Sequence, residues 1–521
     1  MTSPVQNQSP QPRRQLSQLL AADSLANFLR FAVTALSLAA ITPVLTRALE
    51  PDVFAVWTLV FTVSTYVAIA GAGAATAVTR FVSVDRATET GATAKILASV
   101  TWTIVGSVAF GIGLIATIAY RTDWLFRETP TQLVDTARAT IVTLAFASGI
   151  GTVGIALHGY FFSLHRAIVP SLVVVATRIA VATGLAVAAI YTKSLLWLAG
   201  ITLSGAVLST QAMISLTKRN LGEPVVAVRN VRRSWILELV KHSSTIMIWS
   251  LTMVAIAGID VVVVGAYDFG AVGAYGIAAQ AVSLVLGLTN AFLSPLVAVA
   301  ARHHSQGDQH RLAAVMIQFS RLGGTLLVAT SSAMFIMAPW LVEIYAGEQY
   351  AATATPLLRI LVVANVFRNT CSALVTTLIG AGAHRSVLAP TVAEAIVNVS
   401  LSLWLVQMFN AQGVALATLL AAAVGVGAHI VITLRQARVF TVSIAHFTAH
   451  AIGRPTLACM PTAAVYLAQL WFGINTAEAI PVAVFGTLFV GWRFSLAADD
   501  RRRLRKLLES RARPSAQSQD C

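Results

Sequence analysis

Residues 23–37, DSLANFLRFAVTALS, open the first long apolar segment of the chain and carry polar side chains at a regular spacing. Asp23, Asn27, Arg30, Thr34 and Ser37 follow one another at steps of four, three, four and three residues, which places them on one face of a helix. A charged side chain at the centre of a bilayer costs roughly 2.5–3.5 kcal/mol, so this face must turn away from lipid. The stretch therefore predicts a membrane helix that borders other helices or a water-filled cavity.

The composition of the whole chain is that of a membrane protein. Of its 521 residues, 57% are hydrophobic and 11% are charged, and the mean hydropathy is +0.76. A soluble chain would carry roughly 25% charged residues. Apolar runs of about 20 residues, the length that crosses a bilayer as a helix, recur from end to end. We therefore predict an all-α, polytopic membrane protein.

Fourteen segments are candidate transmembrane spans. They cover 24–46, 53–74, 96–120, 138–159, 168–190, 194–216, 240–265, 271–300, 312–338, 356–380, 387–408, 412–434, 455–473 and 478–497. The first and the seventh span each follow a basic segment and carry a polar stripe, and paired halves are common among transporters. The predicted parts are a tail 1–20, a six-helix lobe 21–216, a linker 217–239, a second six-helix lobe 240–434 around a shared central cavity, two further helices in 435–497 and a basic tail 498–521.

The distribution of lysine and arginine predicts the orientation of the chain. Cytoplasmic loops of membrane proteins carry an excess of both residues. With the N-terminus inside, the cytoplasmic segments hold 24 of them and the external loops hold four. Both termini are therefore expected in the cytoplasm. The formal charge of +15 is spread over alternate loops and does not indicate binding of nucleic acid.

The usual motifs of enzymes and metal sites are missing from the sequence. Cys371, Cys459 and Cys521 form no CxxC pair and show no metal-ligand spacing. GIGTVG at 149–154 matches a dinucleotide-binding pattern, but it lies inside an apolar span without a preceding strand. Close packing of helices through small residues explains it better. We predict no catalytic residue, no metal and no cofactor.

The charges that lie deep within the predicted spans are mainly cationic. Arg30, Arg178, Arg321 and Arg368 all fall well inside an apolar segment. The planar guanidinium of arginine matches the oxygens of phosphate and stays charged when it is buried. We therefore predict an electropositive cavity that binds an anionic group such as a diphosphate, lined by at least two of these residues. The alternative is that they form structural pairs with carboxylates or with carbonyl groups at helix ends.

A second set of polar residues shares these spans and is expected to line the cavity or to couple transport to an ion. Glu394 and Asn398 share one face of the eleventh span, and Asn365 and Asn369 share one face of the tenth. Asp23 is the expected salt partner of Arg30. The full set is Asp23, Asn27, Asp260, Asn365, Asn369, Glu394 and Asn398.

Five segments together resemble a known family. They are 42–62 (TPVLTRALEPDVFAVWTLVFT), 71–83 (GAGAATAVTRFVS), 258–280 (GIDVVVVGAYDFGAVGAYGIAAQ), 345–365 (YAGEQYAATATPLLRILVVAN) and 378–406 (LIGAGAHRSVLAPTVAEAIVNVSLSLWLV). In order and spacing they are similar to the polysaccharide transporters of the multidrug/oligosaccharidyl-lipid/polysaccharide exporter (MOP) superfamily, over about residues 20–435. The chain departs from the family at the first hairpin, where Leu49 and Glu50 replace the usual glycine.

The resemblance implies a flippase that moves glycan units linked to polyprenyl diphosphate from the inner to the outer leaflet, by alternating access between two lobes. It implies a bacterial cytoplasmic membrane and contacts with membrane lipids and with a polysaccharide polymerase or biosynthesis complex. We expect a monomer. Cationic cavity residues of the family lie near the lipid diphosphate, and the positions in the matching helices here are Arg30, Arg178, Arg321 and Arg368.

Two other functions stay open at this point. A cation-coupled multidrug antiporter of the same superfamily would need deep carboxylates, for which only Glu394 and Asp260 are candidates. A membrane-integral glycan polymerase or glycosyltransferase would present a large external loop with catalytic acids. The external loops here are short, and Glu50 and Asp52 in the first of them fit a solvated turn.

Overall fold

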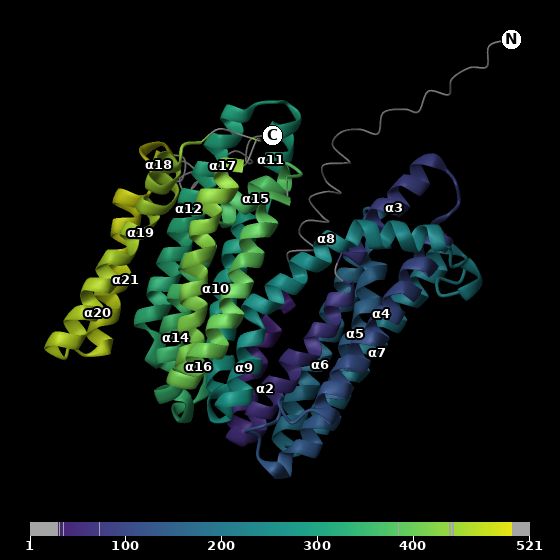
Figure 1. Ribbon diagram of the computed structural model, residues 1–521, viewed down its shortest axis with the longest axis horizontal. Helices are drawn as coiled ribbons and strands as arrows, with labels where there is room; N and C mark the ends of the chain where they lie inside the picture. Colours follow the sequence, from purple (N-terminus) through teal and green to yellow (C-terminus); the bar gives the residue numbers. More distant parts are fainter. Residues whose placement is uncertain are drawn as a thin grey trace, which may run out of the picture. The chain divides into compact units, whose positions relative to one another are not determined.

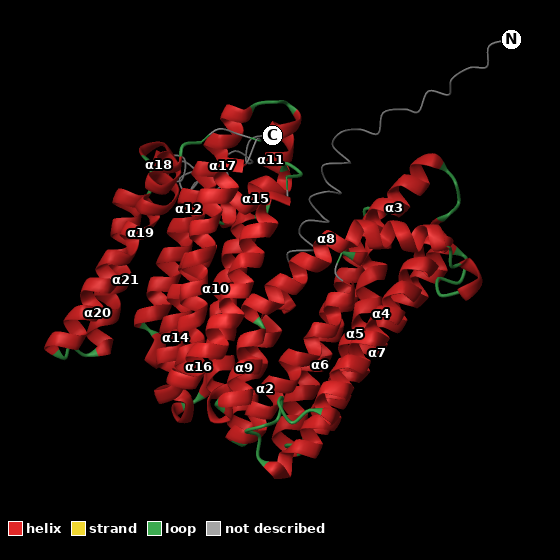
Figure 2. Ribbon diagram, viewed as in Figure 1, coloured by secondary structure: helices red, strands yellow, loops and turns green. Residues whose placement is uncertain are grey.

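The structure is a computed structural model, and it describes residues 30, 32–34, 36–71, 73–383, 385–436, 439 and 442–502. All regular elements of these residues are helices, and none is a strand (Figure 2). The chain divides into two compact units, Met1–Gly273 and Ala274–Cys521. The predicted all-α class is confirmed.

The first unit is organised around one long central helix. Helical residues Ala32–Ala48 come first. They are followed by α2 (Pro51–Thr65), η1 (Tyr66–Gly71), α3 (Ala74–Thr88), α4 (Thr93–Arg121), α5 (Thr131–Ser163), α6 (Ile168–Tyr191), α7 (Leu195–Leu221), η2 (Val228–Asn230), α8 (Arg233–Ala257), α9 (Ile259–Tyr267) and η3 (Phe269–Ala271). Helix α5 packs against α2, α3, α4 and α7 (Figure 1).

Small residues on α5 allow this close packing. A Cβ atom added to Gly154 would lie 2.8 Å from Thr210 Oγ1, whose hydroxyl donates to the carbonyl of Ile150 at 2.8 Å. Gly149 and Gly159 leave equally little room, against Val108 and against the carbonyl of Ala75. The structure thus supports the interpretation of the glycine motif as a packing motif.

The second predicted span, 53–74, is broken near its end. Helix α2 ends at Thr65, a short 3-10 segment follows, and Gly73 takes a left-handed conformation with φ 80° before α3 begins. Glycine adopts this conformation without a steric penalty. Backbone that is not helical is tolerated at membrane depth only where it is buried in protein or lines a cavity. This break therefore marks a place where the first unit can meet something polar.

The linker predicted at 217–239 is attached to α4 of the first unit. The indole of Trp102 donates to the carbonyl of Val226 at 3.0 Å, and the amide of Arg232 donates to Ser99 Oγ at 2.8 Å. Helices α8 and α9 pack on α4 and α2 of the same unit. The seventh span thus packs with the preceding ones, and the division into units falls at Gly273, within α10. The lobes 21–216 and 240–434 stay a prediction.

The second unit contains the remaining helices. They are the rest of α10 (Val272–Leu293), α11 (Pro295–Ser305), α12 (Gln309–Ile336), α13 (Ala338–Ala346), α14 (Glu348–Asn369), α15 (Ser372–Gly380), α16 (Arg385–Ala428), η4 (His429–Thr433), α17 (Leu434–Gln436), α18 (Ile444–Phe447), η5 (Thr448–Gly453), α19 (Arg454–Thr456), η6 (Leu457–Cys459), α20 (Met460–Phe472), α21 (Thr476–Val490) and η7 (Gly491–Ser495). Helix α14 packs against α12, α13 and α16 (Figure 1).

Within the described residues, eleven helices are long and apolar enough to cross a membrane. They match twelve of the fourteen predicted spans, because Arg385–Thr433 covers both the eleventh and the twelfth. Those two helices meet at Asn410, where φ is 50° and the chain turns. The first and thirteenth predicted spans correspond to the shorter helices Ala32–Ala48 and α20. The chain is a multi-pass membrane protein.

An arginine ties the last helical hairpin to the rest of the second unit. The guanidinium of Arg359 in α14 lies 4.8 Å from the ring centre of Tyr466 in α20 and 5.4 Å from that of Phe335 in α12. Its Nε donates to the carbonyl of Phe335 at 3.3 Å. Each cation–π contact is worth roughly 0.5–2 kcal/mol. The two C-terminal helices are therefore part of the packed unit.

A buried carboxylate holds the turn between α3 and α4. Asp85 is 5% exposed, and it accepts hydrogen bonds from the hydroxyls of Thr90 and Thr93 and, at 2.8 Å, from the amide of Ala92. Two of these donors lie at the start of α4, where amide groups have no helical acceptor. Asp85 thus acts as a cap from the preceding helix.

Replacing Asp85 with alanine is expected to lower the free energy of unfolding by about 1–3 kcal/mol, because the donors of Thr90, Ala92 and the buried Thr93 lose their acceptor. Thermal unfolding of the purified protein in detergent measures the effect. Asp123→Ala is the matched control, because Asp123 is fully exposed and its pair with Arg138 is 3.7 Å long. Equal melting temperatures for the two variants would contradict the capping role.

Candidate functional site

The four predicted arginines lie in four different surroundings. Arg30, in the first helix, has its Nη1 3.4 Å from Nδ1 of His158 and its guanidinium 5.6 Å from the ring centre of Phe162. His158 is 4% exposed, and the two α5 residues share a face because they are four positions apart. Both partners are uncharged or weakly basic, so the charge of Arg30 is not neutralised by them. Asp23 and Asn27, its predicted neighbours, lie outside the described residues.

Arg178 lies on an exposed part of α6. Its neighbour Ile179 is 54% exposed, and Leu172 on the same helix is 62% exposed. With the part of the chain that the structure describes, the Arg178 guanidinium makes no hydrogen bond and no ion pair. It is therefore a cation that can meet an external anion without breaking an existing pair.

Arg321 is paired with the segment that follows the last span. Its Nε lies 2.7 Å from Oδ2 of Asp500, and Gln318 donates to the other oxygen of Asp500 at 3.0 Å. The side chains of Arg321 and Asp500 are 11% and 2% exposed. The Asp500 carboxylate already binds the Arg321 guanidinium. The contact of Arg321 with substrate stays a prediction, and this geometry does not favour it.

Sequence analysis missed the role of Asp500. The residue precedes a run of arginines, and that run suggested a basic tail at the membrane surface. Only packing of the chain end against α12 brings the carboxylate to Arg321. The one sequence signal that could have indicated it is an acidic pair, Asp499 and Asp500, placed directly after the last apolar span.

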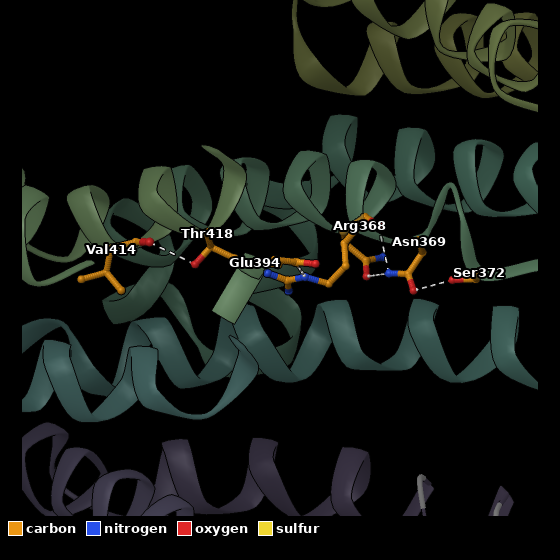
Figure 3. Close-up of polar contacts among 7 residues, drawn as sticks. Arg368, Asn369, Ser372, Glu394, Val414 and Thr418 are labelled. Atoms are coloured by element: carbon orange, nitrogen blue, oxygen red, sulfur yellow. Dashed lines mark hydrogen bonds and ion pairs between the residues drawn. The ribbon is translucent and has the colours of Figure 1, made fainter. Parts of the chain in front are cut away.

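Arg368 and Glu394 form a buried ion pair between α14 and α16. Nε of Arg368 lies 2.7 Å from Oε1 of Glu394, and the two side chains are 22% and 6% exposed (Figure 3). Gly425, in the second half of α16, lies directly against the carboxylate: a Cβ atom there would be 2.8 Å from Glu394 Cδ. A larger residue at position 425 would clash with the Glu394 carboxylate, so glycine allows the two segments of α16 to pack closely here.

A separate chain of side-chain hydrogen bonds lies next to this pair along α14. Ser372 donates to Oδ1 of Asn369 at 3.0 Å, and Nδ2 of Asn369 donates to Oδ1 of Asn365 at 2.7 Å (Figure 3). The chain bridges the break between α14 and α15, which lies between Asn369 and Ser372. This order of donors leaves Nδ2 of Asn365 as the donor at the far end.

Two buried donors on α14 lack an acceptor among the described residues. They are Nη2 of Arg368 and Nδ2 of Asn365. The residues are three positions apart and so share one face of the helix. A buried donor that is left unsatisfied costs about 1–3 kcal/mol. This face of α14 therefore has hydrogen-bonding capacity for an oxygen acceptor, and the guanidinium favours a negatively charged one.

The remaining predicted residues fall in two places. Asn398 is fully buried and lies one turn from Glu394 on α16, in the second unit. Asp260 is 3% exposed and lies in the first turn of α9, directly after the helix break at Gly258. Tyr66 of η1 lies within electrostatic range of Asp260, and a Cβ atom at Gly258 would be 3.0 Å from its ring. Asp260 therefore belongs to the first unit.

The first unit also contains a cavity of about 410 Å³ at the break in the second span. Its wall includes Thr65, Gly71, Gly73 and Thr76 from the broken span and Ser250 from α8. This volume lies within the range of sites for small ligands, roughly 300–1,000 Å³. The side chains that line the cavity are neutral, and those that are polar carry hydroxyl groups.

Comparisons with known proteins agree with the family resemblance. A family model described as polysaccharide biosynthesis protein matches residues 24–302, and a second model, MatE, matches residues 245–404. No curated protein sequence matches the chain.

Solved transporters share the fold. A structure of the lipid II flippase MurJ in an inward closed conformation has a TM-score of 0.69 and 13% identity, and covers 94% of this chain and 100% of its own. An inward-facing multidrug resistance MATE transporter of the MOP superfamily has a TM-score of 0.60 and 15% identity, with 77% and 95% covered. A Vibrio cholerae MATE transporter has a TM-score of 0.59 and 12% identity, with 81% and 98% covered.

These similarities confirm the predicted fold. The identities are low, so the solved structures establish the fold alone. The first family model, however, matches more than half of the 521 residues. The chain therefore belongs to the polysaccharide biosynthesis protein family.

Proposed function

We propose that this protein is a flippase that moves oligosaccharide or polysaccharide repeat units, linked to polyprenyl diphosphate, from the inner to the outer leaflet by alternating access. Membership of a polysaccharide biosynthesis family and a fold shared with a lipid II flippase support the proposal. The protein lies in the bacterial cytoplasmic membrane with both termini inside. It acts as a monomer within a biosynthesis complex that includes a polysaccharide polymerase.

The observation that carries the proposal is the partly satisfied guanidinium of Arg368. Its Nε is bound by Glu394, whereas its buried Nη2 has no acceptor among the described residues. A phosphate oxygen can take the second position without breaking the ion pair. Hydrogen bonds between charged groups are worth about 1.5–3 kcal/mol each. Arg368 would thus bind one end of a diphosphate while Glu394 fixes the orientation of its side chain.

Other polar residues have supporting roles in this proposal. Arg30 and Arg178, in the first unit, are further sites for an anionic group, because no described carboxylate pairs with either of them. Asp23, Asn27, Asp260, Asn369 and Asn398 line the polar path or take part in coupling transport to an ion. Arg321 has the weakest claim because Asp500 already binds it.

A cation-coupled multidrug antiporter is the second candidate, and the match of the MatE model to residues 245–404 favours it. Such a transporter needs a deep carboxylate that can attract a cationic drug. Glu394 is the deep carboxylate of the second unit within that matched region, and Arg368 neutralises it at 2.7 Å. The pair leaves no negative charge for a cationic drug, and the unsatisfied donor Nη2 of Arg368 favours an acceptor such as a phosphate oxygen.

Deletion of the gene is expected to leave lipid-linked repeat units in the inner leaflet of the cytoplasmic membrane, because their synthesis continues while their transfer stops. Leaflet-specific labelling of the lipid-linked glycan measures this. A strain that lacks the polymerase is the control, since its repeat units collect in the outer leaflet. Accumulation in the outer leaflet of the deletion strain would contradict the proposal.

Charge reversal by Arg368→Glu is expected to reduce glycan export by about 10- to 100-fold, which corresponds to loss of one charged hydrogen bond at tenfold per 1.4 kcal/mol. Export is measured as surface polysaccharide at matched protein levels in the membrane. The double variant Arg368→Glu/Glu394→Arg keeps an ion pair at this place but moves the cation to α16. Low export in both variants supports phosphate binding, and full export in the double variant shows that Arg368 serves only to pair Glu394. Arg127→Glu, exposed in an external loop, is the control.

The orientation can be tested with reporters fused after residues 225 and 345. The excess of lysine and arginine on one side predicts that the first fusion is cytoplasmic and the second external. A pair of enzymes that are active on only one side of the membrane gives the readout. The reverse pattern would overturn the orientation.

A further inference from the structure

We propose that the cavity of the first unit binds the sugar that is attached directly to the diphosphate, while Arg30 binds the phosphate beside it. This subsite rests on the proposed function, because it names the part of the lipid-linked glycan that the first unit recognises. Three features of the first unit lead to it: the break in the second span, the chemistry of the cavity wall and the position of Arg30.

The break exposes hydrogen-bonding groups at the cavity. No side chain caps the N-terminus of α3, where Gly73 is the residue before the helix. The first amide groups of a helix have no helical acceptor. Gly73, Ala75 and Thr76 all line the cavity, so these backbone groups belong to its wall. A polar ligand can satisfy them at a membrane depth where lipid cannot.

The side chains of the wall suit a neutral ligand with several hydroxyl groups. Thr65 and Thr76 donate their hydroxyl protons to the carbonyls of Thr62 and Gly73, at 2.6 and 2.7 Å. Their oxygen atoms therefore remain acceptors for hydroxyl groups of a ligand. Ala68, Ile155 and Val254 supply apolar surface between them. A sugar ring has this combination of hydroxyl groups and apolar C–H faces.

The wall argues against the other parts of the substrate. No charged side chain lines the cavity, so a diphosphate inside it would lose its hydration without gaining a cation. A polyprenyl chain would match only the apolar part of the wall and would leave the hydroxyl groups of Thr65, Thr76 and Ser250 without a polar partner on the ligand. The sugar is the part of the substrate that fits both the polar and the apolar wall.

Arg30 is close enough to hold the adjoining phosphate. Its contacts, His158 and Phe162, share a face of α5 with Ile155, which lines the cavity. Ile155 and His158 are three residues apart, so Arg30 reaches α5 a little under one turn, or ~4.5 Å along the helix, from the cavity wall. Gly159, in the same turn as His158, contacts the cavity residue Ala75. The phosphate and its sugar are covalently bonded to each other, so they would occupy two adjacent sites such as Arg30 and the cavity.

The experiment measures binding of two probes to the full-length protein in nanodiscs. One is polyprenyl diphosphate that carries a single sugar, and the other is polyprenyl diphosphate without sugar. The wild type is expected to bind the sugar-bearing lipid at least tenfold more tightly. Ala68→Trp, which fills the cavity from η1, is expected to remove this preference and to leave the affinity for the sugar-free lipid unchanged. Arg30→Ala is expected to weaken binding of both lipids by similar factors.

Matched controls separate the subsite from general disturbance. Ala109→Trp places the same side chain on an exposed position of α4, and it should change neither affinity. Thr76→Val removes one acceptor from the wall and should weaken binding of the sugar-bearing lipid about 3- to 10-fold. Thr117→Val alters an exposed threonine that also donates to its own helix, and it should have no effect.

Three results would overturn the subsite while the flippase proposal stands, and the first two concern affinities. One is equal affinity of the wild type for both lipids, and the other is an equal loss of both affinities in Ala68→Trp. A wild-type protein that binds neither lipid would overturn the proposed function and the subsite together. The third result is that both Ala68→Trp and Thr76→Val still bind the sugar-bearing lipid more tightly than the sugar-free lipid. The sugar would then lie outside this cavity.

Discussion

The need to compensate charge inside a membrane controls how this protein is built. An ion that leaves water for a medium of low polarity loses several kcal/mol of solvation even after the protein relaxes. Arg368 recovers part of this from Glu394, and Arg321 recovers part of it from Asp500. Arg30 has only a histidine and an aromatic ring near it. Arg178 has no partner among the described residues. These two arginines, which no described carboxylate compensates, gain most from an anionic ligand.

Breaks in the helices are the second consequence of placing polar groups within a bilayer. The second, seventh and tenth spans are interrupted at Gly73, at Gly258 and between Asn369 and Ser372. The interruptions at Gly258 and between Asn369 and Ser372 have polar or ionisable side chains at or close to them, such as Asp260 two residues after Gly258. Discontinuous helices of this kind form the substrate sites of many transporters, because unpaired backbone groups become available there. In the first unit such a break lines the cavity, and in the second it lies next to the Arg368–Glu394 pair.

Sequence analysis predicted the membrane class, the spans and the family correctly. Apolar runs of the right length need only composition and order, and the helices observed follow the predicted spans within a few residues for most of the chain. Arg368 and Glu394 were both singled out because a charge within an apolar run is rare, and their pairing was among the alternatives considered. The role of Asp500 and the anchoring of the linker to α4 were missed, since both depend on contacts between residues far apart in the chain.

The sequence by itself therefore determined which segments enter the membrane and which of them carry buried charge. The cost of moving each side chain from water into lipid is local and can be added up along the chain. Only the tertiary structure decided which charge is neutralised, which stays available and where a cavity opens. Those outcomes depend on distances between helices, such as the 2.7 Å between Arg368 and Glu394 and the close approach allowed by Gly425. No local property of the sequence specifies such distances, because they arise from the packing of many side chains at once.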